Sequence, residues 1–353
     1  MQITLENYFI SLTEKFSEQL EFFQWLKEKK YYSIFVLVDE NTNKFCYPLI
    51  ENSIPKHIVL QIRSGEKEKN IETCKFLWEE LTSQKAERKS LLLNLGGGVI
   101  GDMGGFVAGT YKRGIDFINI PTTLLSQVDA SIGGKLGIDF NGIKNLIGLF
   151  GDPKMVLISS EFLSTLPKEQ LRSGFAEILK HGLIKDKSYW EEIKKTDLNS
   201  ISQLNILVAR SVNIKKQVVE SDPFEAGVRK ILNFGHTIGH AMETWSLHND
   251  KVPLLHGEAI AIGMVCEAWL SNKLTGLSKT DLEDISNIIF RFYPKYNLEN
   301  VPTDTLLQHM LLDKKNNNEK INFSLLQTIG DCTYDIQATE DLILDSIKYY
   351  AGL

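Results

Sequence analysis

The segment LLLNLGGGVIGDMGGFVAGTYK, residues 91–112, decides the fold of this chain. Its apolar run predicts a buried strand and its second half permits a helix, so the glycines between them form a strand-to-helix turn. Gly96, Gly98 and Gly101 satisfy the pattern GxGxxG. In a dinucleotide site, such glycines let the backbone approach a pyrophosphate, whose charge is met by free N–H groups at the start of the following helix.

Packing alone is a second explanation of the same glycines. A dinucleotide-binding unit ordinarily has an acidic residue about 20 positions later, at the end of its next strand. No clear candidate stands there, because Asp116 begins the next apolar run instead of ending it. The layout therefore differs from the ordinary Rossmann arrangement, and the motif alone leaves a dinucleotide site and a packing turn equally open.

Strand-like and helix-like segments alternate on both sides of this turn. Further apolar runs predict strands at 33–39, 57–62, 115–120 and 155–159. Amphipathic or helix-permissive segments predict helices near 14–30, 68–87 and 99–112, and from Thr122 onward. Because strands that alternate with helices are joined by crossover connections, we expect a mainly parallel sheet.

The pattern becomes helical from Pro167 onward. Helical periodicity extends roughly over 167–185, 198–220, 231–246, 256–274 and 278–292. A hairpin over 321–338 and a last helix over 339–351 follow. With 353 residues, two domains are expected. We predict an α/β N-terminal domain over residues 1–160 and an all-α C-terminal domain over 161–353, with KKNNNEK (314–320) as an exposed loop.

Composition narrows the class of protein. The 39 Lys and Arg residues against 45 Asp and Glu residues give a net charge of −6, which argues against a general nucleic-acid binder. The four cysteines are scattered without a CxxC pair, which favours reduced thiols and a cytoplasmic protein. The N-terminus lacks the pattern of a signal peptide, and residues 91–108 carry Asn94, Asp102 and several glycines, so we expect no membrane partner.

Two of the seven histidines, His236 and His240, lie in one phrase, RKILNFGHTIGHAME (229–243). On a continuous helix, its polar positions would form one stripe, because they fall at i, i+4, i+7 and i+11. These positions are Arg229, Asn233, His236 and His240. A stripe of one cation, one amide and two imidazoles is too polar for an ordinary buried face, so it predicts a functional site.

A carboxylate and a third histidine complete a candidate metal site. Glu177 lies in the apolar phrase SGFAEILKHGLI, and His256 precedes another apolar helical segment. Two imidazoles and one carboxylate are the ligands of many catalytic zinc sites. Thr237 replaces the Glu of HExxH, which excludes a zincin peptidase. His181, four residues after Glu177, is a rival metal ligand, and sequence spacing alone does not decide between His181 and the other histidines.

Six cations stand in Gly-rich or apolar phrases instead of on solvated faces. They are Arg113, Lys135, Lys144, Lys180, Lys215 and Arg229. Each alone is explained by a salt bridge or by a stem lying along apolar surface. Together they indicate an anionic small molecule, because Lys and Arg bind phosphate and carboxylate. A dinucleotide, a metal and such a substrate suggest oxidation of a metal-bound alcohol.

Several of these phrases, in this order, resemble the 3-dehydroquinate synthase family of sugar-phosphate cyclases. They are GGGVIGDMGGFVAGTYKRGI, PTTLLSQVDASIGGK, GIKNLIG, SGFAEILKHGLI, RKILNFGHTIGHA and LLHGEA, and the likeness runs from about Asp39 to the DKK at 313–315. The resemblance implies a homodimer with an NAD-binding N-terminal domain and a metal-binding C-terminal domain. SGEKEK (64–69) and Leu136 depart mildly from the family pattern.

The resemblance also implies residue roles. The metal ligands, for zinc or cobalt, are Glu177, His236 and His256, whereas His240 contacts the substrate. The NAD-binding residues are Asp39, Asn41, Glu66, Lys69, Gly97, Gly98, Val99, Ile100, Gly101, Asp102, Thr122, Thr123, Lys135, Lys144, Phe162, Leu163, Ser164 and Thr165. The substrate contacts are Asp129, Lys135, Lys144, Asn145, Lys180, Lys215, Arg229, Asn233 and His240, with Arg113 from the partner subunit and either Lys314 or Lys315.

The reaction implied is conversion of 3-deoxy-D-arabino-heptulosonate 7-phosphate to 3-dehydroquinate and phosphate in the shikimate pathway. It is a phosphate-eliminating, cyclising lyase reaction in which NAD is recycled. Two other enzymes remain as alternatives: a different sugar-phosphate cyclase, and a metal-dependent polyol or glycerol dehydrogenase that releases NADH in each cycle. A binding protein without chemistry is a third, weaker alternative, because the set of Glu177, His236 and His256 is complete.

Overall fold

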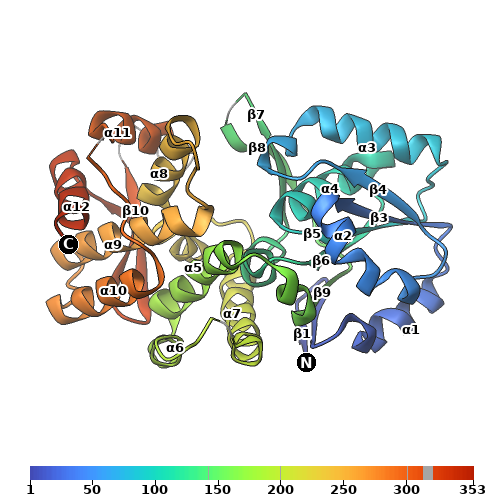
Figure 1. The fold of residues 1–353 in the computed structure, drawn as a ribbon, viewed down its shortest axis with the longest axis horizontal. Helices are drawn as coiled ribbons and strands as arrows, with labels where there is room; N and C mark the ends of the chain where they lie inside the picture. The colour runs from blue at the N-terminus through green and yellow to red at the C-terminus, as the bar shows by residue number, and fades with distance from the viewer. Residues whose placement is uncertain (142, 199, 300, 313–320) are drawn as a thin grey trace. The chain divides into compact units, whose positions relative to one another are not determined.

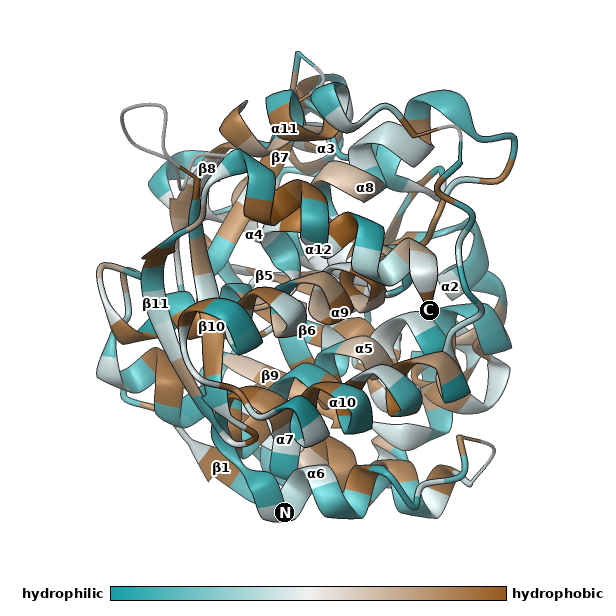
Figure 2. Ribbon diagram, turned by 90° about the vertical axis from the view of Figure 1, so that its left-hand side faces the viewer, coloured by the Kyte–Doolittle hydropathy of each residue, from teal (hydrophilic) through white to brown (hydrophobic). Residues whose placement is uncertain are grey.

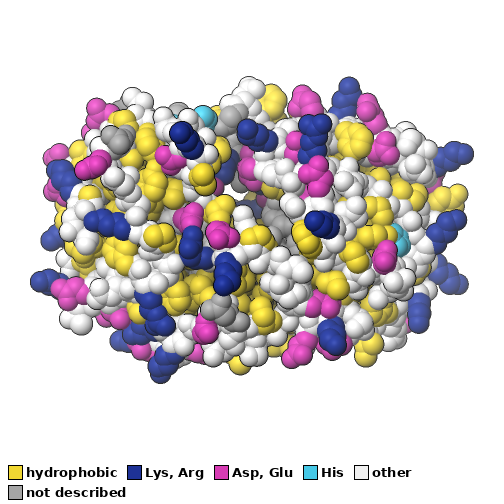
Figure 3. Space-filling model, viewed as in Figure 1, with side chains coloured by type: hydrophobic (Ala, Val, Ile, Leu, Met, Phe, Trp, Pro, Cys, Tyr) yellow, Lys and Arg dark blue, Asp and Glu magenta, His cyan; other side chains and the backbone are white. Residues whose placement is uncertain are grey.

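The computed structural model describes the chain from residue 1 to 353 except residues 142, 199, 300 and 313–320. It forms two compact units, Met1–Pro167 and Lys168–Leu353. Figure 3 shows Lys and Arg side chains intermingled with Asp and Glu over the face drawn there. Lys314 and Lys315, and the loop predicted over 314–320, lie outside the described residues.

A seven-stranded sheet forms the centre of the first unit. Its strand order is β1-β2-β9-β6-β5-β3-β4. The strands are β1 (Gln2–Thr4), β2 (Phe9–Thr13), β3 (Ser33–Asp39), β4 (Ile58–Ile62), β5 (Ser90–Gly96), β6 (Asp116–Pro121) and β9 (Met155–Ser159). Every neighbouring pair is parallel except β1 with β2. The mainly parallel sheet predicted from the sequence is therefore confirmed.

Helices cover both faces of this sheet (Figure 1). They are α1 (Leu20–Lys29), α2 (Glu40–Phe45), α3 (Ile71–Ser83) and α4 (Gly98–Thr110), with short 3-10 helices η1 (Phe16–Glu18), η2 (Tyr47–Leu49), η3 (Glu51–Ser53), η4 (Glu66–Glu68), η5 (Tyr111–Arg113) and η7 (Ser160–Thr165). In β3, Phe35 and Leu37 join the core beneath α3 and α4, whereas Val36 joins the core beneath α1. Burial on both faces explains why the strands are continuous apolar runs.

A hairpin stands where the sequence did not predict strands. Antiparallel β7 (Lys135–Phe140) and β8 (Ile143–Phe150) pack against α4. The helix predicted from Thr122 is only a five-residue π-helical turn, η6 (Ser126–Ala130). Glycines at 133, 134, 137, 148 and 151 interrupt the apolar alternation, so a strand signal is hard to recognise there.

Over its described residues, the second unit is helical apart from one hairpin, as predicted. Its helices are α5 (Lys168–Lys185), α6 (Lys187–Ile193), α7 (Ile201–Ser221), η8 (Val228–Asn233), α8 (His236–Asn249), α9 (His256–Leu274), α10 (Lys279–Phe292), α11 (Thr303–Leu312) and α12 (Glu340–Gly352). Strands β10 (Asn322–Thr328) and β11 (Asp331–Gln337) form the hairpin. No helix among the described residues is long and apolar enough to cross a membrane.

Helix α9 is the central element of this unit. It packs against α5, α8, α10 and α12 and is buried over most of its length. Figure 2 shows hydrophobic and hydrophilic residues alternating along α10 and α12, as expected of helices with one buried face. Helix α9 and its neighbours α5 and α8 therefore carry Glu177, His236 and His256.

The continuous helical stripe from Arg229 to His240 does not form, and the prediction of a helix over 231–246 was wrong at its start. Arg229 and Asn233 lie in the 3-10 helix η8, and α8 begins only at His236. Gly235, between them, has φ of +79°. A side chain there would meet Met264 and Ile260 of α9, so the break is imposed by tertiary packing.

Candidate active site

The glycine turn joins β5 to α4, as predicted. β5 ends at Gly96, Gly97 is the N-cap residue and α4 begins at Gly98. With no N-cap side chain to accept their hydrogen bonds, the first N–H groups of α4 suit an anionic ligand. A Cβ on Gly101 would have no atom within 4 Å, whereas one on Gly104 would lie 2.1 Å from Asn94 Oδ1. Close packing of helix on sheet therefore depends on Gly104 and not on the third glycine of the motif.

Predicted cofactor residues follow the ends of three neighbouring parallel strands, β3, β5 and β6. Asp39 ends β3 and accepts a 2.7 Å hydrogen bond from the Thr42 N–H, which caps α2. Thr122 follows β6 and donates its backbone N–H to Gly96 O at 3.0 Å. A Cβ on Gly97 would lie 3.1 Å from Thr123 Cγ2. The carboxyl ends of adjacent parallel strands are the usual place for a nucleotide.

A buried lysine connects predicted cofactor and substrate residues. Lys69 is 4% exposed, and its Nζ donates to Asp102 Oδ2 and to Asn145 Oδ1, each at 2.6 Å. Burial disfavours the charged amine, but nearby carboxylates, above all Asp102, outweigh it and raise the pKa of Lys69. Lys69 is therefore a fixed positive charge beside the start of α4.

The remaining predicted residues of the first unit lie in short elements around the sheet. Phe162 and Leu163 are buried in η7, and Phe162 belongs to the core. Arg113 is exposed at the end of η5 with φ of +68°. The others are Asn41 in α2, Glu66 in η4, Asp129 in η6, Lys135 at the start of β7, Lys144 in β8, and Ser164 and Thr165 in η7.

Three predicted metal ligands converge in the second unit. Glu177 comes from α5, His236 is the first residue of α8 and His256 is the first residue of α9. Glu177 Oε1 lies 3.5 Å from His236 Nε2 and 3.6 Å from His256 Nε2. One ligand atom from each residue lies within 4.8 Å of the others. Such a spacing leaves room for one ion between them.

In both ligand histidines, a hydrogen bond at Nδ1 fixes the orientation of Nε2. His236 Nδ1 lies 3.1 Å from the backbone oxygen of Phe234, and His256 Nδ1 lies 3.4 Å from Glu243 Oε2. Because a carbonyl or carboxylate oxygen only accepts, each Nδ1 is a donor, and each Nε2 is the nitrogen that faces Glu177 and can bind a metal once it is deprotonated. Two imidazole nitrogens and a carboxylate oxygen are the donor set of catalytic zinc sites.

The surroundings of the cluster favour a positive charge. Burial works against protonation of His256, but Glu243 and then Glu177 outweigh it and raise the pKa of His256 to about 10. Lys180, one turn along α5, forms a buried ion pair with Glu177. The carboxylates of Glu177 and Glu243 therefore favour a bound cation at the imidazoles, whereas Lys180 offsets part of the Glu177 charge.

Two further histidines lie close by. The ring of His240 lies 5.1 Å from that of His236 and 5.9 Å from that of His256, and His240 also groups with Glu243 as a potential ligand. His181 is buried on α5, and its Nδ1 shares a hydrogen bond with the Ser211 hydroxyl. His240 is thus adjacent to the cluster of Glu177, His236 and His256.

Predicted substrate cations of this unit are buried. Lys180, Lys215 and Arg229 are 1%, 5% and 2% exposed. Asp222 accepts the backbone N–H of Arg229 at 3.0 Å, and the Arg229 guanidinium donates to the Pro223 carbonyl. Buried cations attract anions strongly because little water screens them.

Sequence reasoning missed two carboxylates. Glu225 has φ of +60°, and its Oε1 accepts a 2.8 Å hydrogen bond from Asn233 Nδ2. No periodic pattern marks Glu225, because it lies in the turn before η8. Glu243, which faces His256, does follow a signal: it lies seven residues after His236, and that spacing places both on one helix face.

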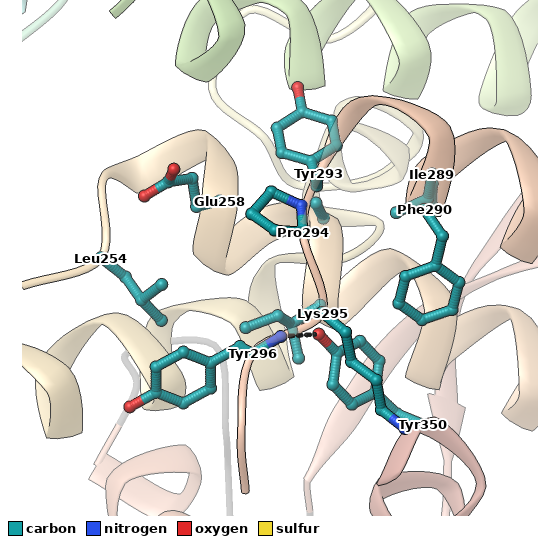
Figure 4. Close-up of a pocket in the computed structure, with 11 residues that line it drawn as sticks. Leu254, Glu258, Ile289, Phe290, Tyr293, Pro294, Lys295, Tyr296 and Tyr350 are labelled. Atoms are coloured by element: carbon teal, nitrogen blue, oxygen red, sulfur yellow. Dashed lines mark hydrogen bonds between the residues drawn. The ribbon is translucent and has the colours of Figure 1, made fainter. Parts of the chain in front are cut away.

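A pocket elsewhere in the helical unit is separate from these residues. Tyr293, Tyr296 and Tyr350 line it together with Glu258, and the Tyr296 N–H donates to Tyr350 Oη at 2.9 Å (Figure 4). None of the residues predicted for the active site lines this pocket in the described part of the chain.

The family models and the sequence relatives that match this chain identify the same family. The family model for the 3-dehydroquinate synthase N-terminal domain matches residues 59–173, and that for the C-terminal domain matches residues 174–316. A 3-dehydroquinate synthase from Parabacteroides distasonis is 44% identical over 330 residues, which cover 92% of this chain and 93% of that protein.

Solved structures share the fold. A 2-deoxy-scyllo-inosose synthase complexed with carbaglucose-6-phosphate, NAD⁺ and Co²⁺ has a TM-score of 0.86 at 24% identity, covering 99% of both chains. A 2-epi-5-epi-valiolone synthase from Streptomyces hygroscopicus, with NAD⁺ and Zn²⁺ bound, has a TM-score of 0.87 at 22% identity, covering 99% of this chain and 98% of that one. The matching family models and the close relative show that this chain belongs to the 3-dehydroquinate synthase family, the cyclising lyases of the shikimate pathway.

Proposed function

We propose that this chain converts 3-deoxy-D-arabino-heptulosonate 7-phosphate to 3-dehydroquinate and phosphate, with recycled NAD and a divalent metal ion held by Glu177, His236 and His256. The observation that carries the proposal is the convergence of two imidazole Nε2 atoms on Glu177 Oε1 within 4.8 Å. Zinc and cobalt both suit this donor set.

The two cofactors supply chemistry that side chains lack. A divalent ion lowers the pKa of a bound hydroxyl, and NAD accepts and returns a hydride. The glycine turn from Gly97 to Asp102 is the proposed pyrophosphate site. Lys69 supports it, because its charge is held beside Asp102 at 2.6 Å.

The protein's own cations bind the substrate in this proposal. Lys215 and Arg229 are almost fully buried, so they form strong charge-assisted hydrogen bonds to phosphate or carboxylate oxygens. The Asp222 carboxylate orients the backbone at Arg229 by accepting the Arg229 N–H. We assign proton movement near the phosphate to His240, and Asn233, whose amide is restrained by Glu225, orients the reacting groups by hydrogen bonding.

The same proposal includes a homodimer in which Arg113 reaches the partner's site. Apolar side chains of the β7–β8 hairpin support a covered surface: Phe140, Leu146 and Phe150 are 38%, 39% and 52% exposed. A cytoplasmic location also belongs to the proposal, because all four cysteines are free thiols.

Mixing two inactive variants tests the shared site. Arg113→Ala removes the residue given to the partner, and Lys215→Ala disables the chain's own site. A dimer of one variant with the other contains one intact site, so refolding an equal mixture should restore part of the activity. Mixtures that stay inactive, although hybrid dimers form, would place Arg113 in its own subunit's site.

The overall reaction is tested by phosphate release with a catalytic amount of NAD, while absorbance at 340 nm follows NADH. We expect phosphate without accumulated NADH, loss of activity after chelation and recovery with zinc. His236→Ala should lose metal and activity together. NADH accumulation with simple polyols would indicate a dehydrogenase, and turnover of sedoheptulose or glucose phosphates alone would indicate another cyclase.

A further inference from the structure

Helices α8 and α9 approach each other closely, and each begins with one histidine of the metal cluster. A Cβ on Gly263 of α9 would lie 1.9 Å from the backbone oxygen of Gly235, and one on Gly239 of α8 would lie 3.1 Å from Ala259 O. Backbones in such contact allow a side chain of medium length on one helix to reach the end of the other.

Glu243 of α8 reaches the histidine that begins α9. Its Oε2 lies 3.4 Å from His256 Nδ1, and its side chain is only 11% exposed. Because a carboxylate accepts the Nδ1 proton, it fixes the ring's tautomer and orientation and makes Nε2 a stronger donor to a metal.

Glu267 of α9 holds the start of α8 in return. It is fully buried, and its two oxygens accept the backbone N–H of Gly235 at 2.6 Å and that of Ile238 at 3.1 Å. The first N–H groups of a helix lack partners within the helix, and a negative charge stabilises that end. Gly235 offers no side chain as a cap, so Glu267 supplies it from the neighbouring helix.

The two contacts are reciprocal. Glu243 on α8 orients His256 on α9, whereas Glu267 on α9 fixes the two residues that flank the start of the helix at His236. We infer that Glu243 and Glu267 are positioning residues for the metal ion, each fixing the ligand histidine of the opposite helix. The inference rests on the metal site in the proposed function and adds two residues outside the ligand set of Glu177, His236 and His256.

The consequence is a metal affinity that depends on both carboxylates. Removing the hydrogen-bond partner of a ligating histidine typically lowers metal affinity by about 10-fold to 100-fold. A purely structural role predicts lower stability with an unchanged metal site. Metal binding and folding stability must therefore be measured separately.

The test uses the full chain with Co²⁺, whose visible spectrum reports ligand geometry. Affinity is measured by competition with a chelator, and stability by thermal unfolding without metal. Glu243→Gln removes the charge and keeps the shape. We expect Co²⁺ binding about 10-fold weaker for Glu243→Gln and about 100-fold weaker for Glu243→Ala.

Glu267→Gln is the second arm. Its amide group places a donor against a backbone N–H, so the start of α8 should shift and the Co²⁺ spectrum should change, with affinity about 10-fold lower. If this variant does not fold, Glu267→Asp, which keeps the charge on a shorter side chain, replaces it with the same expected direction.

Ser271→Ala is the matched control. The Ser271 hydroxyl is buried on α9, one turn from Glu267, and accepts the Leu326 N–H at 2.9 Å. Its loss should lower stability and leave Co²⁺ affinity and spectrum unchanged. The inference is overturned if folded variants of either Glu243 or Glu267 behave like Ser271→Ala.

His236→Ala separates this inference from the proposed function. Its failure to bind Co²⁺ supports the metal site, and wild-type behaviour of the two glutamate variants would then reject the positioning roles alone. Unchanged Co²⁺ binding by His236→Ala would reject the metal site and the positioning roles together.

Discussion

The glycine turn and the histidine cluster are built in opposite ways. The turn consists of contiguous backbone, from Gly96 at the end of β5 to the first residues of α4. The cluster takes one side chain from each of α5, α8 and α9, and its ligands are 79 residues apart in sequence at the extremes, Glu177 and His256.

The two sites should therefore be sensitive to different substitutions. A site of contiguous backbone depends on local conformation and on space at individual glycines. A site of side chains on separate helices depends on how those helices pack, because a small displacement of one helix separates the ligands. Substitutions far from the histidines should therefore affect the cluster, whereas only nearby ones should affect the turn.

Gly263→Ala should have the largest effect. The new Cβ would lie 1.9 Å from Gly235 O and 2.7 Å from Gly239 N, and backbone atoms cannot rotate away. We expect a loss of about 3 kcal/mol or more in the free energy of unfolding, because overpacking costs of roughly 1–3 kcal/mol apply where neighbours can yield. Metal affinity should fall with it. Urea unfolding and Co²⁺ competition measure the two effects.

Gly352→Ala is the control for that experiment. Gly352 lies in the last turn of α12, and a Cβ there would have no atom within 4 Å. The same substitution should leave stability unchanged or slightly raised, since Ala favours a helix. Equal stability of Gly263→Ala and Gly352→Ala would contradict close packing of α8 on α9.

Gly104→Ala tests packing behind the glycine turn. The added Cβ would lie 2.1 Å from Asn94 Oδ1 and 2.9 Å from Leu37 Cδ2. Asn94 is held in place because its Nδ2 donates to Asn119 Oδ1 at 3.0 Å. We expect a loss of about 1–3 kcal/mol in the free energy of unfolding.

A double-mutant cycle with Asn94→Ala checks the cause. Removing the Asn94 side chain opens the space that the new methyl group needs, so Gly104→Ala should cost less in that background. Additive losses would show that the contact between Gly104 and Asn94 does not determine the effect.

Asp222→Asn tests whether the helical unit also contains a local, backbone-built element. Slight burial disfavours ionisation of Asp222, but the N–H groups of Gly227, Arg229 and Ala226 outweigh it and lower the pKa of its carboxyl below the ordinary 3.8. Its contribution is therefore present above the unfolded-state pKa and is lost as the pH falls through the folded-state pKa.

We expect Asp222→Asn to lower stability near neutral pH by at most about 1 kcal/mol, because the group is partly exposed to solvent. The difference from wild type should vanish in acid, where Asp222 is protonated in both states. Unfolding curves over a pH series measure it. Asp331→Asn, at the exposed start of β11, is the control. A difference that persists in acid would argue against the carboxylate.

The sheet was predictable because its central strands are buried on both faces. Residues 33–39 and 91–95 are continuous apolar runs, and β3 and β5 lie where those runs lie. The β7–β8 hairpin was not predictable by the same reasoning. Several of its apolar side chains, such as Phe150, are exposed, and its glycines interrupt the alternation.

Residue types and a family resemblance identified the candidate ligands. The contacts that hold these ligands in place became visible only in the structure. The break at Gly235 follows from the contact with α9, which no local pattern encodes. Glu267 lies in an apolar helical segment and reaches residues about 30 positions earlier, so sequence spacing does not reveal its contact. The roles assigned to Glu177, His236 and His256 remain predictions.

Gly101→Ala should have the smallest effect on stability, and it is the most direct test of cofactor binding at the glycine turn. No atom lies within 4 Å of a Cβ at Gly101, and Ala favours a helix by up to about 1 kcal/mol, so the free energy of unfolding should stay equal or rise. NAD affinity, measured by calorimetry, should fall, because the methyl group occupies space that the proposed pyrophosphate needs. Unchanged NAD affinity in a stable variant would make this glycine dispensable for cofactor binding. Lower stability would instead mean that the helix is tightly packed at Gly101, as it is at Gly104.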